Sequence, residues 1–391
     1  MNRVLFVTNG HGEAAIAERI AHELGRLIPA VRADHLGLVG ETRHETMNEV
    51  GPRRSMPSGG LIAMGNLRNL ARDFAAGLPA LTWAQTSFLR RARKAYDAVI
   101  AVGDTYVLMM ALLVRKRTIF VGTAKSVRVA PYGPVEERIL ARAAARFVRD
   151  EATACALHEH GLAMEPAANA IVDLFDVPDD AEAPRAVSGF DPALAIFPGS
   201  RESAYADAEF LLQVTAALAA RRPALGAVLS VARGLSWERF AGLAERAGWQ
   251  VRTQRDESIP FVLSRDGREI VRAWNGSLGS VLRRVALVLG QAGTANEAAA
   301  AAGVPVVAFE RDGGRKMRWY RRRQRGLLGD ALAVFSGRLD DAVAGVEHIL
   351  SDPALRRRMG ETGRERMGEP GAAARIAQRI ASLIGEVPCG A

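Results

Sequence analysis

Residues 285–310, VALVLGQAGTANEAAAAAGVPVVAFE, constrain the fold of this chain more than any other stretch. The apolar run at 285–289 ends at a glycine, as a buried parallel strand does. A helix is predicted next, with Thr294 as N-cap and Gly303 just past its end, and a second strand is predicted at 304–309. Ligands of open parallel sheets bind at the carboxyl ends of the strands, where a helix N-terminus attracts phosphate. We therefore expect a phosphate-containing ligand at the turn between the strand at 285–289 and the helix that follows it.

A structural interpretation of the same turn competes with ligand binding. Residues 294–297 spell a capping box, in which the Glu297 carboxylate returns to the N-cap amide. A cap alone does not require the further polar or glycine positions Gln291, Gly293 and Asn296 on one turn. These extra positions favour a ligand role for Gln291, Gly293, Thr294, Asn296 and Glu297.

Strand and helix signals alternate through both halves of the chain, which is typical of α/β proteins. Strands are predicted at 4–7, 98–102, 119–121 and 147–148, and then at 194–197, 228–231, 285–289 and 304–309. A chain of 391 residues exceeds one ordinary core, so we predict two Rossmann-like, doubly wound domains facing a cleft. The expected boundaries are 1–178 for the first domain, 179–192 for a linker and 193–370 for the second domain. A helix at 371–391 is expected to pack back on the first domain.

The turn after the first predicted strand reads Asn9, Gly10, His11, Gly12 and Glu13. Its glycines let the backbone approach a ligand, and either His11 or Glu13 is a candidate base. The helix dipole is expected to keep Glu13 ionised, so we predict His11 as the base and Glu13 as its partner or an acceptor ligand. The alternative is that Glu13 only complements the dipole and His11 is a solvated loop residue.

A nicotinamide site is disfavoured at this turn. Ala15 stands where the dinucleotide fingerprint has its last glycine. Asp34, the acidic residue at the appropriate distance, has polar and alanine-rich flanks, and no second strand is predicted there.

Three further turns follow predicted strands. Residues 198–202 read PGSRE, where Gly199 and Ser200 hold Arg201 at a strand end and its planar fork suits a diphosphate. An ion pair between Arg201 and Glu202 is the alternative. In the first half of the chain, the turns after the predicted strands at 98–102 and 119–121 carry Asp104, Thr123 and Lys125. These three residues are candidates for contacts with an acceptor molecule.

The net charge of +9 predicts anionic partners. The run at 314–326, GRKMRWYRRRQRG, carries seven cationic residues around Trp319 and Tyr320. Three interpretations of this run remain: a solvated helix face, a nucleic-acid patch, or a surface for phosphates or anionic lipid. Nucleic acid is the least supported, because no recognition module accompanies the run. Residues 51–94 also mix basic and apolar side chains, as in a helix lying on an anionic membrane or one packed on the first domain.

The cysteine spacing and the lengths of the apolar runs both bear on where the protein is located. The two cysteines, Cys155 and Cys389, have no disulfide or metal spacing, which favours a reducing compartment. The opening apolar run is too short for a signal peptide, and residues 98–114 are interrupted by Asp104, so no transmembrane helix is predicted. We expect a cytoplasmic protein, with a peripheral position on the inner face of the membrane also open.

Several of these motifs together resemble GT-B glycosyltransferases. PGSRE at 198–202 and QAGTANE at 291–297, followed by GVPVVAFE, resemble the donor half of these enzymes, with lipid A disaccharide synthase the nearest match. The opening VLFVTNGHGEAAIAERI, the GD at 103–104 and NAIVD at 169–173 resemble the lipid-A-disaccharide-synthase-related proteins. The N-G-H-G-E turn departs from the E-x-S-G-D turn of the synthase, so lipid A as the product does not carry over.

The resemblance implies a UDP-sugar on the second domain, with Arg201 and the Gly293–Thr294 helix start at the diphosphate and Glu297 at the ribose. The first domain is then expected to hold a lipid or lipid-linked acceptor. No two aspartates have D-x-D spacing, so we expect an inverting transfer without metal or cofactor. A UDP-sugar 2-epimerase of the same fold and a non-catalytic nucleotide-sugar-binding protein are the alternatives, and the oligomeric state stays open.

Overall fold

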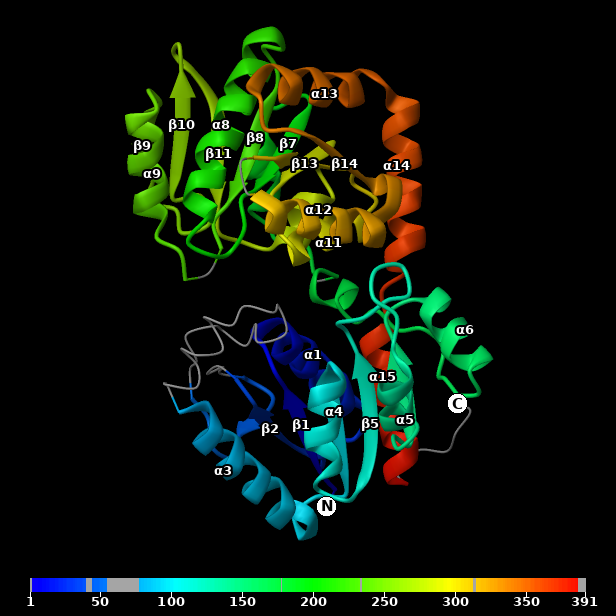
Figure 1. Ribbon diagram of the computed structural model, residues 1–391. Helices are drawn as coiled ribbons and strands as arrows, with labels where there is room; N and C mark the ends of the chain where they lie inside the picture. The colour runs from blue at the N-terminus through cyan, green and yellow to red at the C-terminus, as the bar shows by residue number, and fades with distance from the viewer. Residues whose placement is uncertain are drawn as a thin grey trace. The chain divides into compact units, whose positions relative to one another are not determined.

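The chain divides into two compact units, and each is an α/β structure. The computed structural model describes residues 2–39, 44–54, 77–176, 178–232, 234–311 and 314–385. Unit 1 comprises residues 1–174 and 370–391, and unit 2 comprises residues 175–369 (Figure 1). Each unit is described by itself below.

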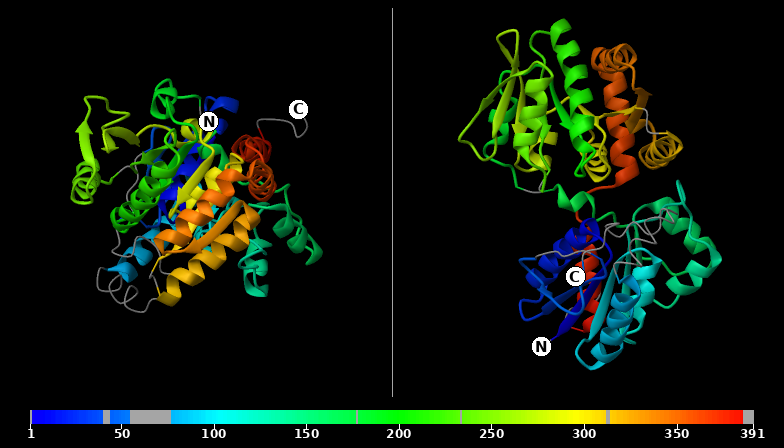
Figure 2. Two further views of the ribbon diagram at one scale, coloured as in Figure 1. Left: turned by 90° about the horizontal axis from the view of Figure 1, so that it is seen from above. Right: turned by 60° about the vertical axis from the view of Figure 1, so that its left-hand side comes forward.

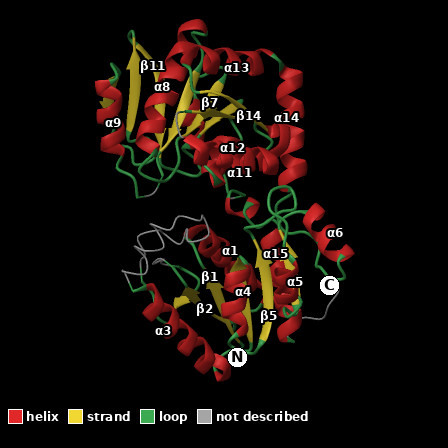
Figure 3. Cartoon of the chain, in the orientation of Figure 1, coloured by secondary structure: helices red, strands yellow, loops and turns green. Residues whose placement is uncertain are grey.

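Unit 1 contains a six-stranded parallel sheet in the order β3-β2-β1-β4-β5-β6. Its strands are β1 (Arg3–Thr8), β2 (Arg32–Gly37), β3 (Asn48–Glu49), β4 (Ala98–Gly103), β5 (Arg117–Gly122) and β6 (Ala145–Val148). Its helices are α1 (His11–Leu27), α3 (Leu78–Arg91), α4 (Thr105–Leu112), α5 (Pro134–Leu140), α6 (Glu151–Glu159) and α15 (Ala372–Ile384), with short 3₁₀ turns η2 (Ala92–Lys94) and η3 (Val172–Leu174). Two apolar cores, one on each face of the sheet, hold these helices in place (Figure 3).

Strand β2 was not predicted, because its sequence RADHLG interrupts the apolar pattern with two ionisable residues. Both residues are buried: Asp34 is 2% exposed and His35 is 0% exposed. Asp34 accepts hydrogen bonds from Arg3 Nε at 2.7 Å and from the Tyr96 hydroxyl at 2.9 Å. Partners from distant parts of the chain therefore make a polar strand stable in the sheet.

The C-terminal helix α15 belongs to unit 1. Its buried face, which includes Ile376 and Ile380, packs against α1 and joins the same apolar core. The Asp173 carboxylate accepts hydrogen bonds from the backbone N–H groups of Gly371 and Ala373, the latter at 2.7 Å, and so fixes the start of the helix.

Unit 2 contains an eight-stranded sheet in the order β14-β13-β12-β7-β8-β11-β10-β9. Its strands are β7 (Ala193–Phe197), β8 (Gly226–Ser230), β9 (Gln250–Thr253), β10 (Phe261–Arg265), β11 (Arg268–Trp274), β12 (Leu287–Gly290), β13 (Val306–Glu310) and β14 (Leu332–Ser336). The strands are parallel except that β10 runs antiparallel to β9 and β11. The sequence analysis did not predict β9, β10, β11 or β14.

Helices cover both faces of the sheet in unit 2, as they do in unit 1 (Figure 2). They are α7 (Ala183–Val187), α8 (Ala204–Arg221), α9 (Trp237–Arg246), α10 (Leu278–Leu282), α11 (Thr294–Ala301), α12 (Gly314–Leu328), α13 (Leu339–Ser351) and α14 (Pro353–Met367), with the 3₁₀ turn η4 (Gly329–Ala331). No described helix in either unit is both long enough and apolar enough to cross a membrane.

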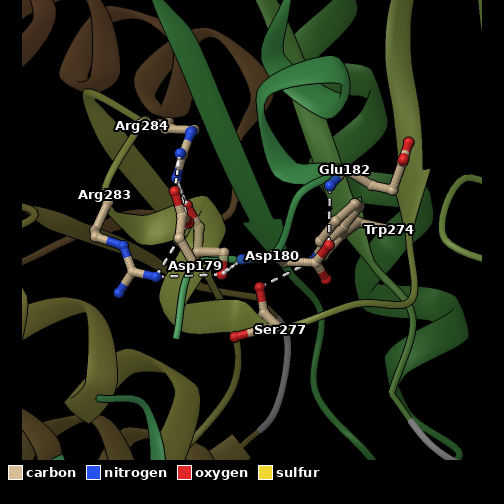
Figure 4. Close-up of polar contacts among 8 residues, drawn as sticks. Asp179, Asp180, Glu182, Trp274, Ser277, Arg283 and Arg284 are labelled. Carbon is tan, nitrogen blue, oxygen red and sulfur yellow. Dashed lines mark hydrogen bonds and ion pairs between the residues drawn. The ribbon is translucent and has the colours of Figure 1, made fainter. Parts of the chain in front are cut away.

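The stretch expected as a linker, 179–192, lies inside unit 2 and includes α7. Asp179 pairs with Arg284 and with Arg283, the latter at 3.1 Å, and the Asp180 backbone N–H donates to Ser280 Oγ at 2.8 Å (Figure 4). The chain instead passes between the units at 174/175, before this anchored segment. The proline and acidic content of 179–192 was read as a linker because the partners that anchor it lie about a hundred residues away.

Candidate functional site

The two predicted donor turns are neighbours in unit 2. Strands β7 and β12 are paired in parallel with Gly290 opposite Phe197, and the Gln291 N–H donates to the Phe197 carbonyl at 2.8 Å. The turns that follow these strands therefore leave the same edge of the sheet side by side. Gly199 has a φ of +117°, a conformation that favours glycine, and it carries the chain from β7 to the exposed Ser200 and Arg201.

The start of α11 has no capping box, contrary to one interpretation of the sequence. Its N-cap is Gly293, which has no side chain, and Thr294 is the exposed first residue of the helix rather than its N-cap. Glu297 is partly buried on the first turn. Because no side chain caps this helix, its first N–H groups present a positive dipole end to any anion at the turn.

Asn296 has a structural position rather than a ligand-facing one. It is 0% exposed, and its side-chain amide donates to the Gly290 carbonyl at 3.1 Å. Its Oδ1 is buried and has no hydrogen-bond partner among the described residues. Asn296 therefore holds α11 against the end of β12, and it is not among the residues that we assign to the ligand.

A buried guanidinium lies behind the same turn. Arg321, on α12, is 3% exposed and donates to the Gln291 side chain and to Gln324 Oε1, the latter at 2.9 Å. Gln324 in turn donates to the Ala292 carbonyl at 2.9 Å, while Gln291 donates to the Phe309 carbonyl at 3.1 Å. The basic run is therefore not a uniformly solvated face: Arg321 is tied to the donor turn, whereas Arg318, Arg322 and Arg325 are exposed.

Arg321 makes no ion pair within the described part of the chain, and its Nε is buried without a hydrogen-bond partner there. Burial lowers the pKa of its guanidinium, although the charges of Tyr320, Asp207 and Glu310 oppose that change. A buried cation whose hydrogen-bond partners are neutral amides leaves net positive charge at the turn. That charge favours an anionic ligand.

Arg201 is exposed and forms no hydrogen bond or ion pair with any described residue. The expected alternative, a pair with Glu202, is wrong because Glu202 pairs with Arg239 at 2.5 Å. Burial raises the pKa of the Tyr320 hydroxyl, and the charges of Arg321, Glu297 and Arg201 all act on it. Arg201 and Glu297 therefore lie near one tyrosine, beside the Gly293 turn.

In unit 1, the predicted acceptor-side turns also leave adjacent strands. Strand β4 pairs with both β1 and β5 in parallel, and the Thr123 N–H donates to the Gly103 carbonyl at 3.1 Å. Asn9 Nδ2 donates to Asp104 Oδ2 at 3.0 Å, and Asp104 Oδ1 caps α4 by accepting from the Val107 N–H at 3.1 Å. Asp104 thus connects the turn after β1 with the start of α4 through its two carboxylate oxygens.

Glu13 and His11 differ from their predicted states. The Glu13 carboxylate folds back over Gly10, with Oε2 only 2.5 Å from the place where a Cβ on residue 10 would lie. Burial raises the pKa of Glu13; the Asp104 charge raises it further, while its own backbone N–H and His11 oppose the shift. The raised pKa makes Glu13 a stronger base than the helix dipole alone predicts. His11 and Gly12 are exposed at the start of α1.

Two residues near this site were missed by sequence reasoning. Lys125 pairs with Glu136, whose other oxygen accepts from the Thr105 hydroxyl at 3.2 Å. Thr123 Oγ1 and the Tyr132 hydroxyl are buried and have no hydrogen-bond partner among the described residues. Burial, reinforced by the Glu136, Asp104 and Asp150 charges, raises the pKa of Tyr132. No local motif marks Tyr132 or Glu136, because only the fold brings them beside Asp104.

Comparisons with known proteins identify the fold. No protein-family model matches the chain, and no curated protein matches it in sequence. A putative UDP-N-acetylglucosamine 2-epimerase from Listeria monocytogenes matches 99% of this chain and 98% of its own, with a TM-score of 0.62 and 15% identity. The calicheamicin glycosyltransferase matches 99% of each chain, with a TM-score of 0.61 and 15% identity. A UDP-GlcNAc 2-epimerase from Neisseria meningitidis, solved bound to UDP-GlcNAc, matches 97% of this chain and 100% of its own, with a TM-score of 0.58 and 12% identity.

The chain has the GT-B fold. This fold is shared by the epimerases and the glycosyltransferases among the similar structures, so the predicted fold class is confirmed. The likeness does not single out lipid A disaccharide synthase.

Proposed function

We propose that this protein binds a UDP-sugar on unit 2 and transfers the sugar to an acceptor hydroxyl with inversion, using a carboxylate of unit 1 as base. The observation that carries the proposal is the β12–α11 turn, where an uncapped helix N-terminus is backed by the buried Arg321. Both supply fixed positive potential without a metal ion. The UDP-GlcNAc bound to the structurally similar Neisseria epimerase supports a uridine nucleotide as the ligand class.

The donor contacts follow from the side chains around this turn. Arg201, on the neighbouring turn, is assigned to the diphosphate because its guanidinium is exposed and its fork matches phosphate oxygens. Glu297, on the first turn of α11, is assigned to the ribose hydroxyls. Gly199, Ser200 and Gly293 let the backbone approach the ligand.

The proposed reaction has one proton transfer and one displacement. Glu13 takes the proton of the acceptor hydroxyl, the acceptor oxygen bonds to the anomeric carbon, and the bond from that carbon to the phosphate oxygen breaks. UDP leaves with the bonding electrons, and its added charge is stabilised by Arg201 and the α11 N-terminus. The raised pKa of Glu13 suits a general base better than an ordinary carboxylate.

The proposed acceptor is a lipid or lipid-linked molecule at the inner face of a membrane, as for a protein related to lipid A disaccharide synthase. In unit 2, Trp319 is 49% exposed among the exposed Arg318, Arg322 and Arg325. In unit 1, Trp83 is 71% exposed on α3, whose last turn carries basic residues at 90 and 91 and is followed by basic residues at 93 and 94 in η2. Exposed tryptophan beside cationic side chains suits an anionic membrane surface. The predicted amphipathic helix at 67–74 lies outside the described residues.

A second candidate is epimerisation of a UDP-sugar, favoured by the similar epimerase structures. Glu13 beside Asp104 also provides a carboxylate of raised pKa for removal of a carbon-bound proton. A non-catalytic nucleotide-sugar-binding protein is less well supported, because it has no use for a partly buried carboxylate of raised pKa. The products distinguish the candidates: a transferase releases UDP only when acceptor is present, whereas an epimerase changes the sugar without acceptor.

We expect UDP and UDP-sugars to bind with one site per chain in excess EDTA, because helix dipole and arginine charge replace a metal. Isothermal titration calorimetry of the whole protein measures this directly. Ligand at about 100 times its dissociation constant is expected to add roughly 2.7 kcal/mol of stability in a thermal-shift screen. Binding that vanishes in EDTA contradicts the metal-free site. Incubation of the bound UDP-sugar with and without membrane lipid extract, followed by NMR of the products, then separates transfer from epimerisation.

Glu297→Gln is expected to weaken UDP binding with little change in the melting temperature. The substitution converts one or two charge-assisted hydrogen bonds to ribose into neutral ones, at ~1 kcal/mol each, or about 5–30-fold in affinity. The start of α11 has no capping box, so the substitution removes no helix cap. Calorimetry with UDP and with uracil compares a ligand that has the ribose with one that lacks it. A lower melting temperature with unchanged UDP affinity contradicts the ribose assignment.

A further inference from the structure

Unit 1 contains a group of buried nitrogen and oxygen ligands that the proposed reaction does not use. His35 on β2, His44 before β3 and Glu49 on β3 each offer one ligand atom, and the three atoms lie within 4.8 Å of one another. Among the described residues this is the one such group of three or more His, Cys, Asp or Glu side chains. The side chains are 0%, 2% and 14% exposed. The group is therefore an enclosed one, not a chance meeting of surface side chains.

The three side chains converge on one point. His35 Nδ1 lies 2.9 Å from Glu49 Oε1, and His44 Nε2 lies 3.2 Å from the same oxygen. Ligands at about 2.0–2.2 Å from a tetrahedral Zn²⁺ lie about 3.3–3.6 Å apart. Small outward shifts of these side chains give that spacing, with the fourth position left to water.

Each outward-facing atom of the group has its own partner. His44 Nδ1 lies 2.9 Å from Glu18 Oε2 on α1, and His35 Nε2 lies 2.9 Å from the Thr8 hydroxyl at the end of β1. Glu49 Oε2 lies 2.7 Å from Arg53 Nη1. A carboxylate on the far nitrogen of a histidine is the arrangement that orients metal-ligating imidazoles in proteins. Glu18, Thr8 and Arg53 are accordingly positioning residues.

His44 faces carboxylate oxygens with both of its ring nitrogens. Nδ1 lies 2.9 Å from Glu18 Oε2, and Nε2 lies 3.2 Å from Glu49 Oε1. His35 Nδ1 lies 2.9 Å from the same Glu49 oxygen, so a third ligand atom reaches the same point.

We propose that His35, His44 and Glu49 bind one Zn²⁺ that ties β2 and β3 to α1 and to the end of β1. Two imidazoles and one carboxylate form a donor set that suits zinc. The proposed ion is structural and its ligands belong to unit 1, whereas the assigned donor contacts belong to unit 2. Thr8 precedes Asn9, so zinc would also fix the turn that carries Glu13. This proposal is independent of the proposed reaction.

The test is zinc binding by the whole, untagged protein after removal of metals with EDTA and dialysis. Titration with Zn²⁺ against a chromophoric chelator is expected to give one tight site per chain. His44→Ala is expected to lower the affinity by at least about 100-fold, because even a positioning partner contributes about 10–100-fold. Glu18→Gln, which keeps the ligands themselves, is expected to lower it by about 10–100-fold.

The matched control is His160→Ala. His160 Nδ1 also lies close to a carboxylate, at 2.8 Å from Glu137, but its side chain is 59% exposed and has no third ligand. This variant is expected to bind Zn²⁺ as the wild-type protein does. Circular dichroism and melting curves in EDTA establish that each variant is folded. The intense visible bands of four-coordinate Co²⁺ are expected in the wild-type protein and are expected to be lost in His44→Ala.

Three outcomes would overturn the zinc site. They are the absence of a stoichiometric site in the wild-type protein, an equal loss of affinity in His160→Ala, and a weak six-coordinate Co²⁺ spectrum. UDP binding is measured on the same EDTA-treated protein, so loss of the zinc site and loss of the donor site are separate results.

Discussion

Glu13→Gln is expected to lower turnover by about 10²–10⁴-fold while the affinity for UDP stays within about twofold of wild type. The substitution keeps the size of the side chain but removes the group that accepts the acceptor proton. UDP affinity is preserved because the assigned donor contacts, Arg201 and Glu297, belong to unit 2. Steady-state kinetics with the acceptor identified by the product assay, together with calorimetry for UDP, measure both quantities.

The pH dependence of the same residue supplies a second readout. Glu13 acts as a base only when ionised, so kcat/KM is expected to fall as the pH drops through its raised pKa, above the range of an ordinary glutamate. The folded state favours the protonated form, so this contribution to stability is full below the unfolded-state pKa and is lost as the pH rises through the folded-state pKa. Glu13→Gln is therefore expected to melt at a higher temperature than wild type at neutral pH. The difference is expected to shrink in acid.

His11→Gln is the comparison for Glu13. The sequence analysis predicted His11 as the base. Its exposure at the first position of α1 and the raised pKa of Glu13 favour the reverse assignment. We expect His11→Gln to retain most of the activity. Full activity in Glu13→Gln together with an inactive His11→Gln contradicts this assignment, and activity in both variants removes the turn from catalysis.

Arg201→Ala is expected to weaken UDP binding by about 1.5–3 kcal/mol, or roughly 10–150-fold, the contribution of a charge-assisted hydrogen bond to phosphate. Uridine, which lacks the diphosphate, is expected to lose little affinity. The melting temperature is expected to hold, because Arg201 is exposed and pairs with no described residue. Calorimetry with UDP and uridine in EDTA is the measurement.

Arg252→Ala controls for the loss of one positive charge from unit 2. Arg252 is an exposed arginine on the edge strand β9 and pairs with Glu269 at 2.9 Å. Its removal is expected to leave UDP affinity unchanged apart from a small, salt-dependent effect. Equal losses in Arg201→Ala and Arg252→Ala, or equal losses for UDP and uridine, contradict a specific diphosphate contact.

The apolar strands and the turns after them were predictable because their signals are local. Predicted apolar runs overlap eight of the observed strands, namely β1, β4, β5, β6, β7, β8, β12 and β13. The turns at 9–13 and 291–297 were recognised from glycine and polar residues at strand ends. By contrast, β2 was missed because the partners of Asp34 and His35, namely Arg3, Tyr96 and Glu49, come from other segments. The edge strand β9, QVRT, has too few apolar residues to be distinguished from a loop. Strands β10 and β14, FVLSR and LAVFS, contain short apolar runs that the sequence analysis did not identify as strands.

The sequence by itself determined the α/β class and the turns that carry Glu13, Arg201 and Glu297, because hydrophobic periodicity and turn chemistry act over a few residues. The GT-B architecture was expected from the resemblance of its motifs to GT-B glycosyltransferases. Only the tertiary structure decided the burial, the neighbouring charges and the hydrogen bonds of those side chains. It placed the partly buried Glu13 carboxylate over Gly10, brought Arg321 behind Gln291 and excluded a capping box at α11. It also gathered His35, His44 and Glu49 at one point. Burial and charge pairing arise between segments that are distant in sequence, so no local pattern encodes a raised pKa or a shared ligand.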